Sequence, residues 1–71
     1  MRQTIARWES QSGKHFVSVW CDRYGCGYLS NNGAGNMGNI TALEATTCIA
    51  DRIARGEFQP DANKIPMKRV L

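Results

Sequence analysis

The segment around Thr41 has the clearest local pattern in the chain, and it limits what the rest can fold into. Thr41 and Glu44 have the spacing of a capping box, in which each side chain satisfies a backbone N–H at the start of a helix. Small and aliphatic residues then recur at helical spacing, at Ala42, Ala45, Ile49 and Ile53. Gly56 is a natural helix stop. The pattern predicts a helix over residues 42–55 with a narrow apolar stripe.

The length of the chain sets the second limit. A chain of 71 residues buries only about 60% of the surface that it exposes when unfolded, so its core is marginal. This length excludes a doubly wound dinucleotide fold, a barrel and a two-domain enzyme. We expect a single α+β domain over residues 1–71, held together by a disulfide, a metal or a second subunit.

Three segments before the helix are typical of β-strands. They span residues Thr4–Glu9, His15–Asp22 and Cys26–Ser30, and short turns separate them. Connections this short pair strands in the antiparallel direction. We therefore predict an α+β fold with a small antiparallel three- to four-stranded sheet packed by one α-helix. Its order is β-β-β-α, which a C-terminal edge strand can extend.

Two other segments are predicted to be irregular. Residues 31–39 hold three glycines and four asparagines, a composition typical of a loop. Gly33–Gly38 matches G-x-G-x-x-G, but the chain lacks the parallel strands of a dinucleotide fold, so we interpret it as a flexible contact loop. The alternative is that the amides of residues 38–42 meet a phosphate or a carboxylate. Residues 59–71 are predicted to form an extended C-terminal arm, in which Pro66 places any strand at a sheet edge.

Charge and the N-terminal sequence bear on location and partners. Nine Lys and Arg against six Asp and Glu give a net charge of +3, which is mild beside the dense basic stripe of a dedicated DNA-binding domain. No apolar stretch follows Arg2, and no segment is apolar enough to span a membrane. We therefore expect a cytoplasmic protein, in the cytosol of a bacterial host. The three cysteines are expected to be reduced there.

Four residues have the chemistry of zinc ligands. Cys21 and Cys26 flank a glycine-containing bend, His15 shares a strand face with Cys21, and Cys48 lies on the flank of the helix. From His15 onward the chain resembles the C-terminal half of the small phage restriction-alleviation zinc proteins, which implies a half zinc ribbon. The spacing here is C-x4-C instead of C-x-x-C, and the family's first cysteine pair is absent. We therefore expect no metal and treat the thiols as small hydrophobes.

No catalytic constellation is visible in the sequence. His15 is the only histidine, and no motif places an activated Ser or Cys and an orienting acid beside it. The six acids do not form a motif of paired carboxylates. We expect a protein without enzymatic activity and without a cofactor.

Partner contacts are expected from a strand face, the loop and the arm. Phe16 and Trp20 share the strand face opposite Val17 and Val19, and one of the two faces needs cover, with Leu29 as a further candidate. An uncovered apolar face predicts a homodimer or a surface for another partner. The loop and the arm are expected to reach a partner without contributing to the core. The residues expected to bind it are Phe16, Trp20, Asn32, Asn36, Met37, Lys64, Lys68 and Arg69.

Two further resemblances bear on function. The three strands, the Gly/Asn loop and a helix opening with Thr-Ala-Leu-Glu-Ala, over Thr4–Ala54, resemble AP2-type and integrase arm-binding domains, which implies DNA binding through the sheet. In size, build and lack of catalytic residues the chain is similar in type to the small phage-encoded anti-CRISPR proteins, with no shared motif. The first interpretation is a non-catalytic phage or mobile-element protein that occludes a host protein or nucleoprotein complex. The alternatives are a small DNA-binding domain and a half zinc-ribbon antirestriction protein.

Overall fold

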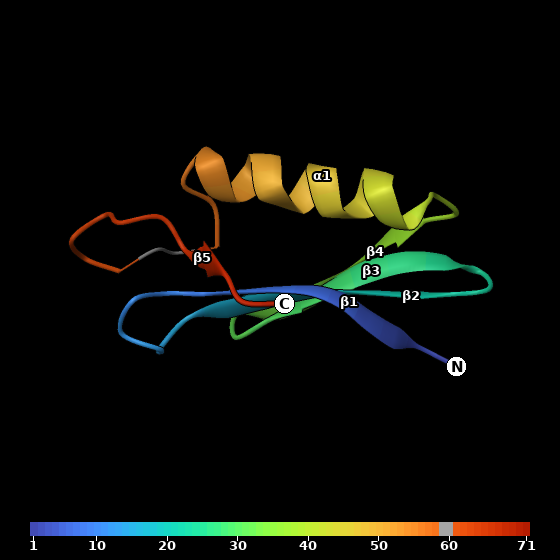
Figure 1. Ribbon diagram of the computed structural model, residues 1–71, viewed down its shortest axis with the longest axis horizontal. Coiled ribbons are helices and arrows are strands. Elements are labelled where there is room, and N and C mark those ends of the chain that lie inside the picture. Colours follow the sequence, from blue (N-terminus) through green and yellow to red (C-terminus); the bar gives the residue numbers. More distant parts are fainter. Residues whose placement is uncertain (59–60) are drawn as a thin grey trace.

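The computed structural model describes residues 1–58 and 61–71, which form one antiparallel sheet and one helix (Figure 1). The elements are β1 (Gln3–Glu9), β2 (Phe16–Asp22), β3 (Gly25–Ser30), β4 (Gly33–Gly38), α1 (Ala42–Ala54) and β5 (Lys68–Arg69). Across the sheet the strand order is β4-β3-β2-β1-β5. The predicted α+β class and the predicted C-terminal edge strand are confirmed. No helix in the described ranges has the length and apolar character needed to cross a membrane.

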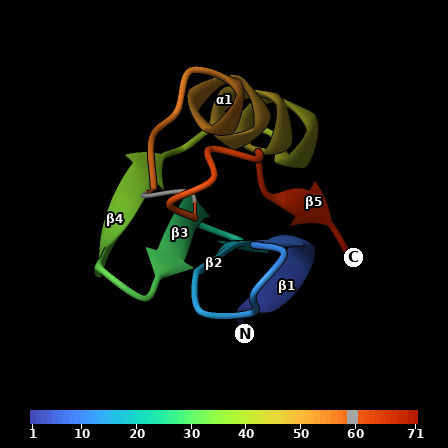
Figure 2. The same cartoon turned by 90° about the vertical axis from the view of Figure 1, so that its left-hand side faces the viewer.

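The core lies between α1 and one face of the sheet. α1 and the segment leading to β5 lie on the same side of the sheet, and no described segment covers the other side (Figure 2). As predicted, the buried stripe of α1 packs with the valines of β2. The buried apolar residues are Ala6, Trp8, Val17, Val19, Cys26, Ala45, Ile49, Ile53 and Met67.

α1 begins at the capping box that the sequence predicts. Thr41 Oγ1 accepts a hydrogen bond from the Glu44 amide over 3.1 Å, and Glu44 Oε1 accepts one from the Thr41 amide over 3.0 Å. These hydrogen bonds hold the pKa of the Glu44 carboxyl below its ordinary value. Just beyond the helix, Gly56 takes a φ of +87°, which a residue with a side chain rarely adopts.

The prediction that residues 31–39 form a loop is wrong, because β4 runs through them. A two-residue turn joins β3 to β4, and Ser30 Oγ fastens it by donating to the Gly33 carbonyl over 3.0 Å. Glycine suits this strand because the Tyr28 ring lies across it. A Cβ added at Gly35 would lie 2.7 Å from Tyr28 Cζ. The G-x-G-x-x-G segment is therefore a strand against which the Tyr28 ring of β3 packs, and it does not have the conformation of a phosphate loop.

The C-terminal segment packs on the domain. Met67 is 6% exposed and belongs to the core, and the Val70 amide donates to the Arg7 carbonyl over 2.7 Å. Ser12 Oγ and the Ser12 amide donate to the two carboxylate oxygens of Asp61, over 2.6 and 3.0 Å, and lower the pKa of Asp61. The first two residues of the predicted arm, 59–60, lie outside the described residues. The expectation that this segment contributes nothing to the core is wrong, because Met67 is buried in the same cluster as the apolar residues of α1 and the sheet.

Cys21 and Cys26 form a disulfide, so the expectation of three reduced thiols is wrong. Asp22 Oδ1 accepts hydrogen bonds from the Tyr24 and Gly25 amides, over 2.8 and 3.1 Å, and closes a tight turn between β2 and β3. The register of this hairpin places the two cysteines directly opposite each other, with their Cα atoms 4.1 Å apart. The geometry of the turn therefore brings the two sulfur atoms together.

Candidate binding surface

The face of the sheet that points away from α1 is the candidate site, here called the open face. Because side chains alternate along a strand, the residues between the buried ones point to this face. Arg7 lies between buried Ala6 and Trp8, and Ser18, itself only 8% exposed, lies between buried Val17 and Val19. The register then assigns to the open face Thr4, Arg7, Glu9, Phe16, Ser18, Trp20, Gly27, Leu29, Ala34 and Asn36.

Both aromatic rings of the open face lie beneath arginines. The guanidinium carbon of Arg2 is 3.9 Å from the centroid of the Trp20 ring, and that of Arg7 is 4.4 Å from the centroid of Phe16. These distances are typical of cation–π contacts. Each ring is half-buried as a result. The predicted bare apolar patch at Phe16 and Trp20 is therefore wrong: this face is a layer of guanidinium groups on rings.

Trp20 is held flat by the strand beside it. It pairs across the sheet with Gly27, and a Cβ added at Gly27 would lie 2.7 Å from Trp20 Cε2. The bare backbone of β3 therefore supports one side of the ring, while Arg2 covers another. A shallow hollow of about 160 Å³ adjoins the ring, lined by Arg2, Trp20, Asp22, Tyr24, Gly25 and Asn36.

Leu29 supplies the apolar centre of the open face. It is 48% exposed and pairs with Ser18 on β2 and with Ala34 on β4, both of them small residues. Arg7 lies beyond Ser18 and pairs with Glu9 over 2.9 Å. An exposed leucine among fixed rings and guanidinium groups can contact another apolar surface, while the outward N–H groups bind carboxylates, phosphates or carbonyls.

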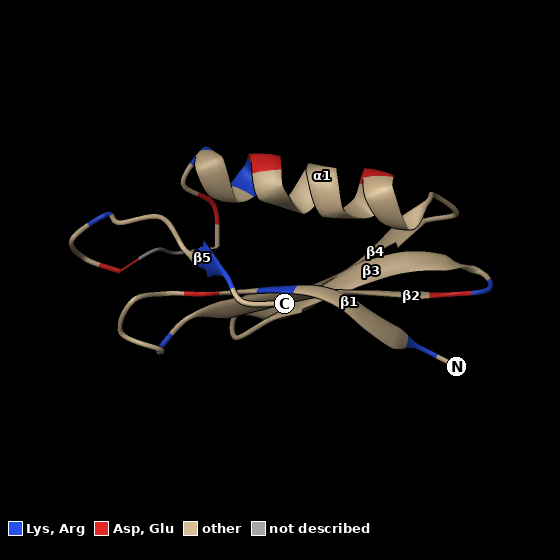
Figure 3. Ribbon diagram, in the orientation of Figure 1, with Lys and Arg blue, Asp and Glu red and all other residues tan. Residues whose placement is uncertain are grey.

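Pairing of rings with arginines extends over the whole molecule. Every aromatic side chain has a guanidinium carbon within 5.5 Å of its ring centroid. Energetically significant contacts of this kind occur roughly once per 70–80 residues in proteins generally. This chain is therefore rich in ring–guanidinium contacts. Figure 3 shows the charged residues spread over both layers, which agrees with the mild basic charge.

Three of the eight residues predicted to bind a partner lie together, and five do not. Phe16, Trp20 and Asn36 are on the open face. Met37 is half-buried against the core, which leaves little of it for a partner. Asn32 is in the turn before β4, and Lys64 is exposed in the segment before β5. The last two, Lys68 and Arg69, form β5, where Arg69 lies 5.5 Å from the Trp8 ring centroid.

The four candidate zinc ligands do not come together. Cys21 and Cys26 are bonded to each other, and Cys48 is exposed on α1. His15 is at the other end of β2 from Cys21, with its Nδ1 3.1 Å from Asn31 Nδ2. Within residues 1–58 and 61–71, no three His, Cys, Asp or Glu side chains are grouped as metal ligands.

Arg2 and Arg7 are the site residues that sequence reasoning missed. The signal for Arg7 was present, because it alternates with Trp8 along a strand and must point to the opposite face. No local signal existed for Arg2, which meets Trp20 only through the register of β1 with β2. A comparison of this chain with protein-family models, curated proteins and solved structures finds no match.

Proposed function

We propose that this chain is a non-catalytic binding protein that covers part of a larger protein or nucleoprotein complex with its open face. The observation that carries the proposal is the pairing of Trp20 and Phe16 with Arg2 and Arg7 on a sheet face that no described segment covers. Aromatic and arginine side chains are the residues most enriched at the centres of protein interfaces. Because the rings are already fixed, binding costs little side-chain entropy.

The proposal extends to the class of partner. We infer a phage or mobile-element inhibitor that occludes a bacterial defence complex, of the CRISPR nucleoprotein type, in the host cytosol. The small size and the mild charge of +3 support a protein that acts by occupying a surface. A surface that combines Leu29 with guanidinium donors suits the mixed apolar and anionic exterior of a nucleoprotein.

Two exposed leucines, one on the open face and one on α1, provide the matched test. Leu29 is 48% exposed on the open face, and Leu43 is 76% exposed on α1. We expect Leu29→Asp to weaken partner binding by about tenfold or more and Leu43→Asp to leave it unchanged. The measurement is capture from a bacterial lysate, with and without nuclease, followed by titration of the purified partner. Equal binding by both variants would contradict the proposal.

Direct nucleic-acid binding is the second candidate, and the guanidinium-on-ring pairs favour it because bases stack on such surfaces. Its signature is an affinity for an oligonucleotide that falls steeply with salt. Arg2→Gln and Arg7→Gln should make this salt dependence less steep.

Self-association through the same face stays a prediction as well. Sedimentation at micromolar to millimolar concentration reports whether a homodimer forms and whether Leu29→Asp dissociates it.

A further inference from the structure

The two edges of the sheet are finished differently. At the β1 edge, β5 pairs with Trp8 and Glu9, and the Val70 and Leu71 amides donate to the Arg7 carbonyl over 2.7 and 3.3 Å. At the opposite edge, β4 pairs with β3 alone. In the part of the chain that the structure describes, alternate N–H and C=O groups of β4 therefore have no strand partner.

β4 has one feature that protects an edge strand, a bulge at Met37 where its register with β3 shifts, but residues 33–36 pair with β3 without interruption. Its sequence, Gly-Ala-Gly-Asn-Met-Gly, contains no charged residue and no proline. Its largest side chain, Met37, packs towards the core. Small side chains leave the backbone within reach of another extended segment. An edge of this kind is a template for strand addition, in which main-chain hydrogen bonds give affinity and neighbouring pockets give specificity.

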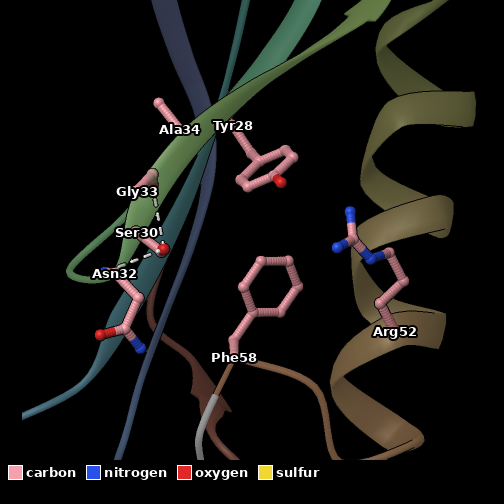
Figure 4. A pocket seen from close by; sticks show the side chains of 7 residues that line it. All are labelled: Tyr28, Ser30, Asn32, Gly33, Ala34, Arg52 and Phe58. Atoms are coloured by element: carbon pink, nitrogen blue, oxygen red, sulfur yellow. Dashed lines mark hydrogen bonds between the residues drawn. The ribbon is translucent and has the colours of Figure 1, made fainter.

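A hollow of about 310 Å³ opens at the start of β4, lined by Tyr28, Ser30, Asn32, Gly33, Ala34, Arg52 and Phe58 (Figure 4). The Tyr28 and Phe58 rings meet edge to face, with centroids 5.4 Å apart and planes at 77°. Phe58 holds this place with a φ of +66°, an unfavourable backbone conformation for a bulky residue. The described segments therefore form an aromatic hollow directly beside β4, the edge strand that pairs with β3 alone.

Arg52 extends from α1 towards both rings of the hollow (Figure 4). Its guanidinium carbon is 5.1 Å from the Tyr28 centroid and 4.7 Å from the Phe58 centroid, and its Nε donates to Glu57 Oε1 over 3.1 Å. Burial opposes its charge, but hydrogen bonds with Tyr28 and Glu57 outweigh burial and raise the pKa of Arg52. A guanidinium carries five N–H donors, so one Nε contact leaves others for a carboxylate.

We propose that β4 and the Arg52 hollow form a binding site for an extended peptide segment of a partner protein. The segment adds to the sheet beside β4 and places an Asp or Glu side chain in the hollow, on Arg52. The charge argues for an acid: among the described residues that line the hollow, Arg52 alone is charged, and its ion pair with Glu57 engages only Nε. A second copy of this chain fits less well, because residues 31–43 contain no acid to meet Arg52.

The test begins with a displayed library of random nine-residue peptides, from which those that bind the intact protein are selected. The enriched peptides are expected to share an Asp or Glu at one position. A blocked synthetic copy of one of them should shift the backbone amide resonances of residues 33–38. Arg52→Gln should weaken that peptide about tenfold, the loss expected for a charge-assisted hydrogen bond. When the acidic residue of the peptide is replaced by Asn or Gln, Arg52→Gln should no longer change the affinity.

Arg55→Gln is the matched control. Arg55 is the C-cap residue of α1, its side chain is 63% exposed, and it is not among the residues that line the hollow. The amide spectrum of each variant reports whether it is folded. Peptides enriched without an acid, shifts confined to the open face, or equal loss in Arg55→Gln would overturn the proposal. So would concentration-dependent shifts of β4 without peptide, which would mark self-pairing. Leu29 does not line the hollow and Arg52 is not on the open face, so Leu29→Asp and Arg52→Gln test the two proposals separately.

Discussion

The two faces of the sheet use aromatic rings in different ways. On the face beneath α1, Trp8 is 5% exposed and belongs to the core with residues of the helix and Met67, although Arg69 also approaches its ring to 5.5 Å. On the open face, Trp20 and Phe16 are half-buried beneath Arg2, which precedes β1, and Arg7, which belongs to β1. A chain with one helix can cover only one face. The guanidinium groups cover the rings of the other while presenting donors to a partner.

The comparison predicts that the two faces contribute very unequally to stability. Ile49 is fully buried on α1, and Ile49→Ala should lower the free energy of unfolding by about 3 kcal/mol through lost burial and a cavity. Leu29→Ala on the open face should change it by about 0.5 kcal/mol or less. Urea unfolding followed by circular dichroism measures both. A similar loss in both variants would show that the open face is part of the core.

Reduction of the disulfide should have the next largest effect. Cys21 and Cys26 join the hairpin beneath α1, and closing so short a loop stabilises the fold by about 2 kcal/mol. Urea unfolding with and without a thiol reductant should show this loss. Reduction should leave the Trp20 environment unchanged once the protein is refolded, since Gly27 and Arg2 still hold the ring. No change in stability on reduction would contradict the assigned role of the bond.

The helix and three strands were predictable because their signals are local. The capping box at Thr41 and the glycine at position 56 set the ends of α1, which matches the prediction to within a residue. β4 was missed because its glycines and asparagines are typical of loops. Glycine is needed there because the Tyr28 ring lies on Gly35, a contact that exists only once β3 and β4 pair.

The candidate site was only partly predictable. Alternation along β2 correctly placed Phe16 and Trp20 on one face. The arginines that cover them come from β1 and the residue before it, so the contacts depend on register between strands. The disulfide was not predicted, because reduced cysteines are expected from a cytoplasmic location. The register of a two-residue turn already places Cys21 opposite Cys26.

Removing the guanidinium groups should have a smaller effect on stability than on binding. Arg2→Met and Arg7→Met keep an aliphatic side chain but lose the charge over the ring, and each should cost about 0.5–1 kcal/mol of stability. Arg55→Met is the control, because within the described residues Arg55 contacts no aromatic ring and forms only exposed ion pairs. Losses as large as that of Ile49→Ala would mean that these arginines are core elements.

Acid should lower the free energy of unfolding through Glu44 and Asp61, and this is the smallest of the expected effects. The pKa values of Glu44 and Asp61 are lowered by hydrogen bonds from Thr41 and Ser12. A lowered pKa contributes stability above the ordinary carboxyl value, about pH 4, and that contribution is lost as pH falls through the lowered value. Glu44→Gln with Asp61→Asn removes both titrating carboxyls and should therefore flatten the acid side of the stability curve. An unchanged slope would contradict this origin.

Quenching of single-tryptophan variants by acrylamide tests the proposed open-face interface most directly. Trp8→Phe leaves Trp20 as the only tryptophan, on the open face, and Trp20→Phe leaves Trp8, beneath α1. With the partner captured from lysate bound, Trp20 should become markedly less accessible to acrylamide, while Trp8 should stay as protected as before. Unchanged quenching of Trp20 in the complex would contradict binding through the open face.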